Sequence, residues 1–169
     1  MRIIVSDTSC MIDLRKASLL REVLALPFSF IMPNTLFEDE WLDLSEDERR
    51  ELRQRGLEVR DLPGPVVERA MRYFNQHRKL KLNDCFALCL AEENADSILL
   101  TGDGTLRQIG AGKGIEVRGV LWVIDELENH GSVPLRRLYE VLQLFRDDDL
   151  IFLPADEVQR RLRRIAQLL

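Results

Sequence analysis

The amino-acid sequence predicts an α/β fold with a mostly parallel central sheet and extra helices at its C-terminus. Short apolar runs recur up to residue 117, and segments with helical periodicity lie between them. Strands that alternate with helices are typical of a parallel sheet covered on both faces, a three-layer α/β/α sandwich. From residue 131 onward the periodicity is helical only. We therefore expect a first unit over residues 1–130 and a helical extension over 131–169, packed on the same domain.

The expected strands are short and apolar. The first covers residues 2–6, Arg-Ile-Ile-Val-Ser, and its β-branched residues are typical of a buried parallel strand. The segment 57–60 has one apolar face and is expected at an edge of the sheet. The remaining strands are predicted over 28–32, 97–100 and 115–117.

Helices are expected in the intervals between these strands and after the last one. Pro33 ends the second strand and favours the start of a helix. Spacings of three and four place five side chains on one face of that helix: Leu36, Phe37, Glu40, Trp41 and Leu44. Further helices are predicted over 8–24, 66–78, 82–94, 119–129, 134–146 and 154–168.

Composition limits the classes of function. The net charge is −5, from 24 Lys and Arg against 29 Asp and Glu, whereas a protein that binds nucleic acid through bulk charge is usually basic. Any nucleic-acid binding must therefore use local basic patches or a bound cation. No apolar run approaches the roughly 18 residues of a membrane span, and Asp7 comes too early for a signal peptide. We expect a cytoplasmic protein without membrane association.

Three cysteines, Cys10, Cys85 and Cys89, give no disulfide framework, because their number is odd and no secretory signal is present. Cys85 and Cys89 lie four apart on one predicted helix, but no Cys or His cluster completes a zinc site. We expect all three to be buried as small apolar side chains.

Acidic residues stand at the ends of predicted strands and at the starts of helices. Asp7 follows the first strand and Asp103 follows the strand at 97–100. Because ligands of open α/β sheets bind beyond the carboxyl ends of the strands, we expect these acids to lie close together. Glu40 projects from an apolar helix face, where a charge needs a partner. Asp84 opens the helix over 82–94.

Each acid alone has a structural interpretation: Asp84 as an N-cap, Asp103 as a turn residue, and Glu40 as a charge at the rim of the core. Together they indicate a cation site, because clustered carboxylates repel one another unless a cation neutralises them. Ligands that are all oxygen favour Mg²⁺ or Mn²⁺ over zinc. Such a cation activates water and neutralises charge on a phosphodiester. The predicted catalytic and metal-binding residues are Asp7, Glu40, Asp84 and Asp103.

Four segments resemble motifs of the PIN-domain family. Asp7-Thr8-Ser9 after a short strand is similar to its opening motif, and Leu82-Asn83-Asp84 resembles the start of the helix that carries its third acid. The segment 99–103, Leu-Leu-Thr-Gly-Asp, resembles its apolar-apolar-Thr-x-Asp motif, and 115–120 is similar to the closing strand and turn of VapC-type members. The resemblance covers roughly residues 1 to 130.

The second acid of the family is a Glu a few positions after a Pro, usually followed by a large apolar residue. Glu40 fits best because Trp41 follows it, while Glu38 and Asp39 remain alternatives.

The resemblance implies metal-dependent hydrolysis of single-stranded RNA by the four acids, supported by Thr8, Ser9 and Thr101. Many members are toxins held inactive by a co-expressed antitoxin, and many form homodimers. This chain departs from the common toxin, because extra sequence runs over 45–65 and the C-terminal helices extend past the usual end. The departure weakens the toxin role more than the nuclease fold.

Two other classes remain as alternatives. One is a PIN-like binding module without turnover. The other is a phosphate-accepting receiver or phosphatase, which also has an Asp after its first strand. A haloacid-type phosphatase expects a second Asp where Ser9 stands, and no Lys occurs between Lys81 and Lys113.

A glycine-rich segment and a basic cluster are two further patterns that can indicate ligand binding. Residues 110–114, Gly-Ala-Gly-Lys-Gly, fail the P-loop pattern because Arg107 and Gly114 occupy the required Gly and Ser or Thr positions. A mobile surface turn is expected there. The basic cluster at 160–164 is interpreted either as the solvated face of an amphipathic helix or as a contact for RNA or a partner.

Overall fold

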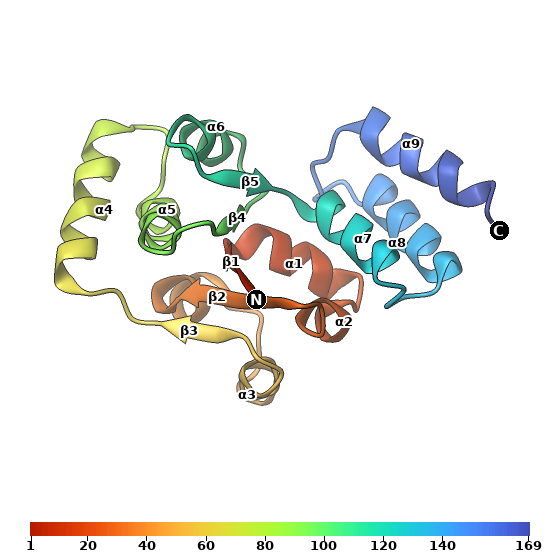
Figure 1. Ribbon diagram of the computed structural model, residues 1–169, viewed down its shortest axis with the longest axis horizontal. Helices are drawn as coiled ribbons and strands as arrows, with labels where there is room; N and C mark the ends of the chain where they lie inside the picture. The colour runs from red at the N-terminus through yellow and green to blue at the C-terminus, as the bar shows by residue number, and fades with distance from the viewer.

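The computed structural model describes residues 1–169, and its five strands form one all-parallel sheet in the order β3-β2-β1-β4-β5 (Figure 1). All five predicted strands are present. The expected edge position of residues 57–60 is confirmed, because β3 lies at one end of the sheet. The strands are β1 (Arg2–Ser6), β2 (Phe28–Pro33), β3 (Glu58–Arg60), β4 (Ile98–Leu100) and β5 (Glu116–Arg118).

Helices cover both faces of the sheet. Figure 1 shows α4 and α5 on one side and α1, α2 and α7 on the other, so the predicted three-layer α/β/α sandwich is confirmed. The helical segments are α1 (Thr8–Lys16), α2 (Leu20–Leu24), η1 (Leu36–Glu40), α3 (Glu46–Gln54), α4 (Gly64–Gln76), α5 (Leu82–Glu93), α6 (Gly104–Gly112), α7 (Val120–Asn129), α8 (Leu135–Asp147) and α9 (Ala155–Ala166). None of them is both long and apolar enough to span a membrane.

Helix α5 is buried between the sheet and α4, and its residues from Asp84 to Ala91 are all buried. This explains its nearly continuous apolar sequence, which lacks the polar face of a surface helix. The cysteines are buried as predicted, Cys85 and Cys89 on α5 and Cys10 on α1. Burial raises the pKa of Cys85 to about 12, so this thiol stays protonated.

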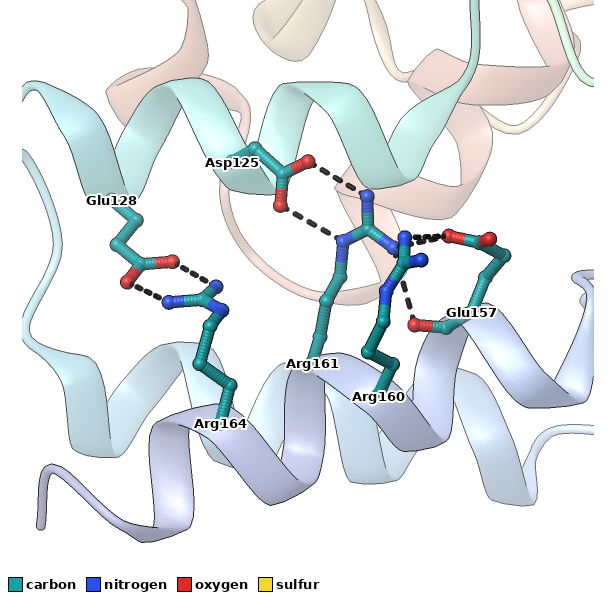
Figure 2. Close-up of polar contacts among 6 residues, drawn as sticks. All are labelled: Asp125, Glu128, Glu157, Arg160, Arg161 and Arg164. Atoms are coloured by element: carbon teal, nitrogen blue, oxygen red, sulfur yellow. Dashed lines mark hydrogen bonds and ion pairs between the residues drawn. The ribbon is translucent and has the colours of Figure 1, made fainter.

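The C-terminal helices share the apolar core of the sheet, to which they contribute buried residues such as Leu142 and Ile165. Two arginines of α9 reach acids of α7 (Figure 2): Arg161 donates two hydrogen bonds to Asp125, at 2.8 and 2.7 Å, and Arg164 donates two to Glu128, both at 2.6 Å. We call these four residues the α7–α9 clamp. The solvated-face interpretation is therefore wrong for Arg161, whose side chain is only 14% exposed, whereas Arg164 stays exposed while it pairs with Glu128.

The helix predicted from Pro33 is much shorter than its apolar pattern suggests. Only the π-helical turn η1 forms, and it ends before Trp41, whose backbone N–H donates to the carbonyl of Leu36 at 3.0 Å. The buried Arg49 of α3 then binds the carbonyl oxygens of Phe37 and Trp41. A side chain from another helix thus satisfies carbonyls that a longer helix would have bonded itself.

Two helices lie where none was predicted. Helix α3 occupies the extra segment after Ser45, which caps it by accepting a hydrogen bond from the backbone N–H of Glu48. Helix α6 includes Gly110, so the expected mobile turn at 110–114 is wrong over its first three residues. A Cβ at Gly110 would lie 3.1 Å from Val117 and 3.3 Å from Leu99. The glycine therefore allows α6 to lie close against β4 and β5.

Candidate active site

Asp7 stands at the junction of β1 and α1, and only 4% of it is exposed. It is the N-cap of α1, because its Oδ1 accepts a hydrogen bond from the backbone N–H of Thr8 at 2.8 Å. Burial raises its pKa to about 6, helped by the charges of Asp84 and Glu40 and opposed by the hydrogen bond from Thr101. The carboxyl group is thus held in a place that disfavours its charged form.

Two hydroxyl groups fix the other oxygen of Asp7. Thr101 Oγ1 donates to Oδ2 at 2.8 Å and accepts from the backbone N–H of Asp103 at 3.1 Å. Ser9 Oγ donates to the same oxygen at 3.3 Å and accepts from the N–H of Gly102 at 3.0 Å. This network is possible because β1 and β4 are parallel neighbours with Ser6 opposite Leu100. The next residues of both strands therefore meet at one edge.

The predicted supporting residues have different environments. Thr101 and Ser9 hold Asp7 through their hydroxyl groups, as described above. Thr8 contributes its backbone N–H, while its own hydroxyl oxygen is buried without a hydrogen-bond partner.

Asp84 and Asp103 also lie at helix N-termini. Asp84 is at the third position of α5, and its Oδ2 accepts from the backbone N–H of Lys81 at 2.9 Å. Asp103 is the N-cap of α6 and accepts from the N–H of Leu106 at 2.8 Å. The N-cap interpretation is wrong for Asp84, because Lys81 is the N-cap of α5 and Asp84 binds its backbone N–H from the third helical position. Asp103 is an N-cap and not a turn residue. These positions place three helix N-termini, with their positive dipole ends, at one acidic region.

Glu40 is half-buried at the end of η1, and its Oε2 accepts a hydrogen bond from Asn83 Nδ2 at 3.0 Å. Asn83 precedes Asp84 on α5, so this contact brings the second predicted acid beside the third. The neighbouring acids differ. Glu38 is exposed and pairs with Arg53 at 3.1 Å, and Asp39 is exposed.

We call Asp7, Glu40, Asp84 and Asp103 the carboxylate site. The acids are close enough to influence one another: the pKa of Asp84 is raised first by burial and then by the charges of Asp103 and Glu40. None of the four takes part in any of the 19 ion pairs of the molecule. The charge of Lys81 lowers the pKa of Asp84, but no basic side chain forms an ion pair with any of the four acids.

The donor chemistry of this site fits a hard divalent cation, because the available groups are carboxylate oxygens. In the present arrangement, however, no three Asp, Glu, His or Cys side chains converge closely enough to hold a metal ion together. Shifts of the side chains would be needed to bring three oxygens onto one ion.

Comparison with known protein families assigns this chain to a family. A family model described as a PIN domain matches residues 3–167. The chain belongs to the PIN-domain family. PIN domains are generally nucleases and typically use divalent metal ions. No curated protein matches the sequence.

Two solved structures are similar to this chain at low sequence identity, and the first of them shows the same fold. A PilT N-terminus domain protein, SSO1118 from the archaeon Sulfolobus solfataricus P2, is 16% identical with a TM-score of 0.50, covering 75% of this chain and 94% of its own. A domain of a protein of unknown function from Methanocaldococcus jannaschii is 19% identical with a TM-score of 0.47, covering 70% and 91%. The family model extends through α8 and α9, so the C-terminal helices lie within the matched region of this PIN domain.

Sequence reasoning missed one residue of the site. The sequence pattern indicates Asn83 only as part of the start of α5, whereas its side chain donates a hydrogen bond to Glu40. An amide directly before a site acid is a weak signal, since Asn is equally common at helix starts for capping alone.

Proposed function

We propose that this PIN-domain protein is an endoribonuclease that cleaves single-stranded RNA with Mg²⁺ or Mn²⁺ bound at the carboxylate site. The observation that carries the proposal is the absence of any basic partner for four neighbouring acids, two of which are buried. A site of this kind binds a cation in preference to staying charged and empty.

The residues have separate roles in the proposed reaction. Asp7, Asp84, Asp103 and Glu40 would hold the cation, which supplies a water activated for attack and neutralises charge on the phosphodiester. Thr101 and Ser9 orient Asp7 through their hydroxyl groups, and Asn83 orients Glu40. A carboxylate fixed by such neighbours loses little freedom when it binds its ligand.

The test is a cleavage assay with labelled single-stranded RNA, a matched RNA duplex and single-stranded DNA. Protein freed of metal with a chelator should be inactive, and Mg²⁺ or Mn²⁺ should restore cleavage of the single-stranded RNA. The control is Asp7→Asn, which keeps the cap of α1 because Asn caps helices as well as Asp does. A folded wild-type protein that cleaves no RNA with either metal would refute the proposal, as would cleavage that Asp7→Asn leaves unchanged.

The toxin role implied by the family resemblance is a further proposal. A site with unneutralised acids fits an inhibitor that places a basic side chain against them. Expression of the chain should slow growth, and co-expression of a small protein encoded beside it should relieve the effect. Normal growth during strong expression of an active protein would exclude a toxin while leaving the nuclease intact.

A further inference from the structure

A cavity of about 800 Å³ lies next to the carboxylate site. Ser9 and Gly102 line it, and both belong to the hydrogen-bond network around Asp7. The start of α7 and residues 150–154, the link between α8 and α9, form other parts of its wall. Its volume is within the roughly 300–1,000 Å³ of sites for small ligands. We call it the Phe152 cavity.

The cavity holds one uncommitted positive charge. Arg107 of α6 is exposed and takes part in none of the ion pairs. Its guanidinium lies against Gly119, since a Cβ on that glycine would be 2.6 Å from Nη2. The other basic residues of the wall are paired: Arg118 with Glu116, Lys16 with Asp148, and Arg161 with Asp125 and Glu157.

Phe152 presents an aromatic ring to solvent at the wall of the same cavity, and 86% of the residue is exposed. The neighbouring Ile151 is buried and Leu153 is half-buried, so the backbone on both sides is anchored. Trp122 also lines the cavity, but its ring packs against Phe28 with centroids 5.6 Å apart. Phe152 is therefore the aromatic side chain that is free to contact a ligand.

The α7–α9 clamp attaches the helix that follows Phe152 to α7. Residues 150–154 lead directly into α9, and Arg161 in the middle of that helix is bound to Asp125 of α7 (Figure 2). The side chain of Arg161 is only 14% exposed. The clamp thus fixes the end of the loop that carries Phe152.

We propose that the Phe152 cavity binds a nucleotide of the RNA adjacent to the cleaved phosphodiester, with its base stacked on Phe152 and a phosphate paired with Arg107. The inference rests on the proposed function and deepens it. A free arginine complements a phosphate, and an exposed aromatic ring stacks on any base. Only a single strand can turn its base out to stack in this way. The C-terminal extension therefore contributes to the substrate site.

Acidic groups at the cavity do not oppose this assignment. Glu157 is bound by Arg160 and Arg161. Asp13 has no ion-pair partner, but burial raises its pKa to about 6, an effect increased by Asp148 and reduced by Lys16. Glu157 is thus neutralised within the molecule, and the charge of Lys16 offsets part of the charge of Asp13.

The test measures RNA binding separately from cleavage. In the Asp7→Asn background, a fluorescent single-stranded ten-residue RNA is titrated and its fluorescence polarisation recorded. Phe152→Ala should weaken binding about tenfold, since base–aromatic stacking contributes at about that level, and Phe152→Trp should keep it. Arg107→Gln should lower the slope of log Kd against log salt by about 0.7. A matched RNA duplex should be insensitive to Phe152→Ala.

The matched control is Phe74→Ala, which removes a partly exposed phenylalanine of α4 that does not line the cavity. It should leave RNA binding unchanged. Equal affinities for Phe152→Ala and Phe74→Ala would overturn the proposal and assign the exposed ring to a protein contact. Failure of the nuclease proposal looks different: wild-type protein would then cleave nothing with metal, although RNA binding still depended on Phe152.

Discussion

The α7–α9 clamp and the carboxylate site both contain acids, but the acids of the clamp are paired with arginines and those of the carboxylate site are not. In the clamp, Asp125 and Glu128 each accept two hydrogen bonds from one arginine. In the carboxylate site, Asp7, Asp84 and Asp103 accept hydrogen bonds only from backbone N–H and hydroxyl groups.

The pKa values follow this difference. The hydrogen bonds from Arg164 hold the pKa of Glu128 below its ordinary value, whereas burial raises the pKa of Asp7 to about 6. The clamp therefore uses its charges within the molecule to attach α9. The carboxylate site keeps its charges available for a cation, and the metal-free protein bears their repulsion.

The largest expected effect is the loss of cleavage in Asp84→Asn and Asp103→Asn. Asn keeps the helix-start hydrogen bonds of these residues but removes the charge. Activity should fall by more than about 100-fold, because even groups that only orient a metal ligand cost about 10–100-fold when lost. Melting curves without metal should hold steady or rise, and the stabilisation by added Mg²⁺ should shrink.

Variants that melt early and still respond to Mg²⁺ like the wild type would break the comparison. The acids of the carboxylate site would then be structural, as those of the clamp are.

The stability of the metal-free protein should depend on pH through Asp7. Its pKa is raised from 3.8 to about 6 on folding, so between these values the folded state binds more protons than the unfolded chain. The free energy of unfolding should therefore fall as pH rises from about 4 to about 6, by about 3 kcal/mol from this group at 1.36 kcal/mol per unit.

Chemical denaturation at a series of pH values in a chelator measures this fall. Asp7→Asn should reduce it but not remove it, because Asp13, whose pKa is also raised to about 6, titrates over the same range. Added Mg²⁺ should flatten the curve by favouring charged carboxylates. Identical pH dependence in wild type and Asp7→Asn would contradict the burial of an unneutralised charge.

A smaller effect separates Glu40 from Glu38. Glu40→Gln should lower cleavage about tenfold or more, which corresponds to a rise of about 1.4 kcal/mol or more in the activation free energy. The reason is that the charge of Glu40 acts on Asp7 and Asp84. Glu38→Gln should have little effect on cleavage, since Glu38 pairs with Arg53 and Arg49 at the surface. The rates are measured at saturating Mg²⁺. A greater loss of cleavage in Glu38→Gln than in Glu40→Gln would assign the role of second site acid to Glu38.

The smallest effect is expected in the clamp. Asp125→Asn leaves Arg161 with Glu157 as its only carboxylate partner, and the free energy of unfolding should fall by about 1 kcal/mol because the pair is partly exposed and solvent-screened. Mg²⁺ should stabilise this variant as much as the wild type. A gain in metal-free stability, of the kind that Asp84→Asn and Asp103→Asn can show, would remove the distinction between the two regions.

The sequence by itself determined where along the chain the strands and most helices lie, and it indicated where acids would gather. Alternating apolar runs specify parallel strands, and parallel strands bring their carboxyl ends to one edge. Asp7 and Asp103 could therefore be placed near each other without coordinates. Local rules also indicated that Asp84 lies at the start of a helix, although not that its carboxylate accepts a hydrogen bond from the backbone N–H of Lys81.

Only the tertiary structure decided features that depend on partners distant in the sequence. Periodicity predicted a long helix after Pro33, but Arg49 from α3 binds the carbonyls of Phe37 and Trp41 where η1 ends. The burial of Gly110 depends on β4 and β5. The Phe152 cavity likewise needs α6, α7 and the link before α9 together. A sequence pattern records the preferences of a segment, whereas these contacts arise only when separate segments pack against one another.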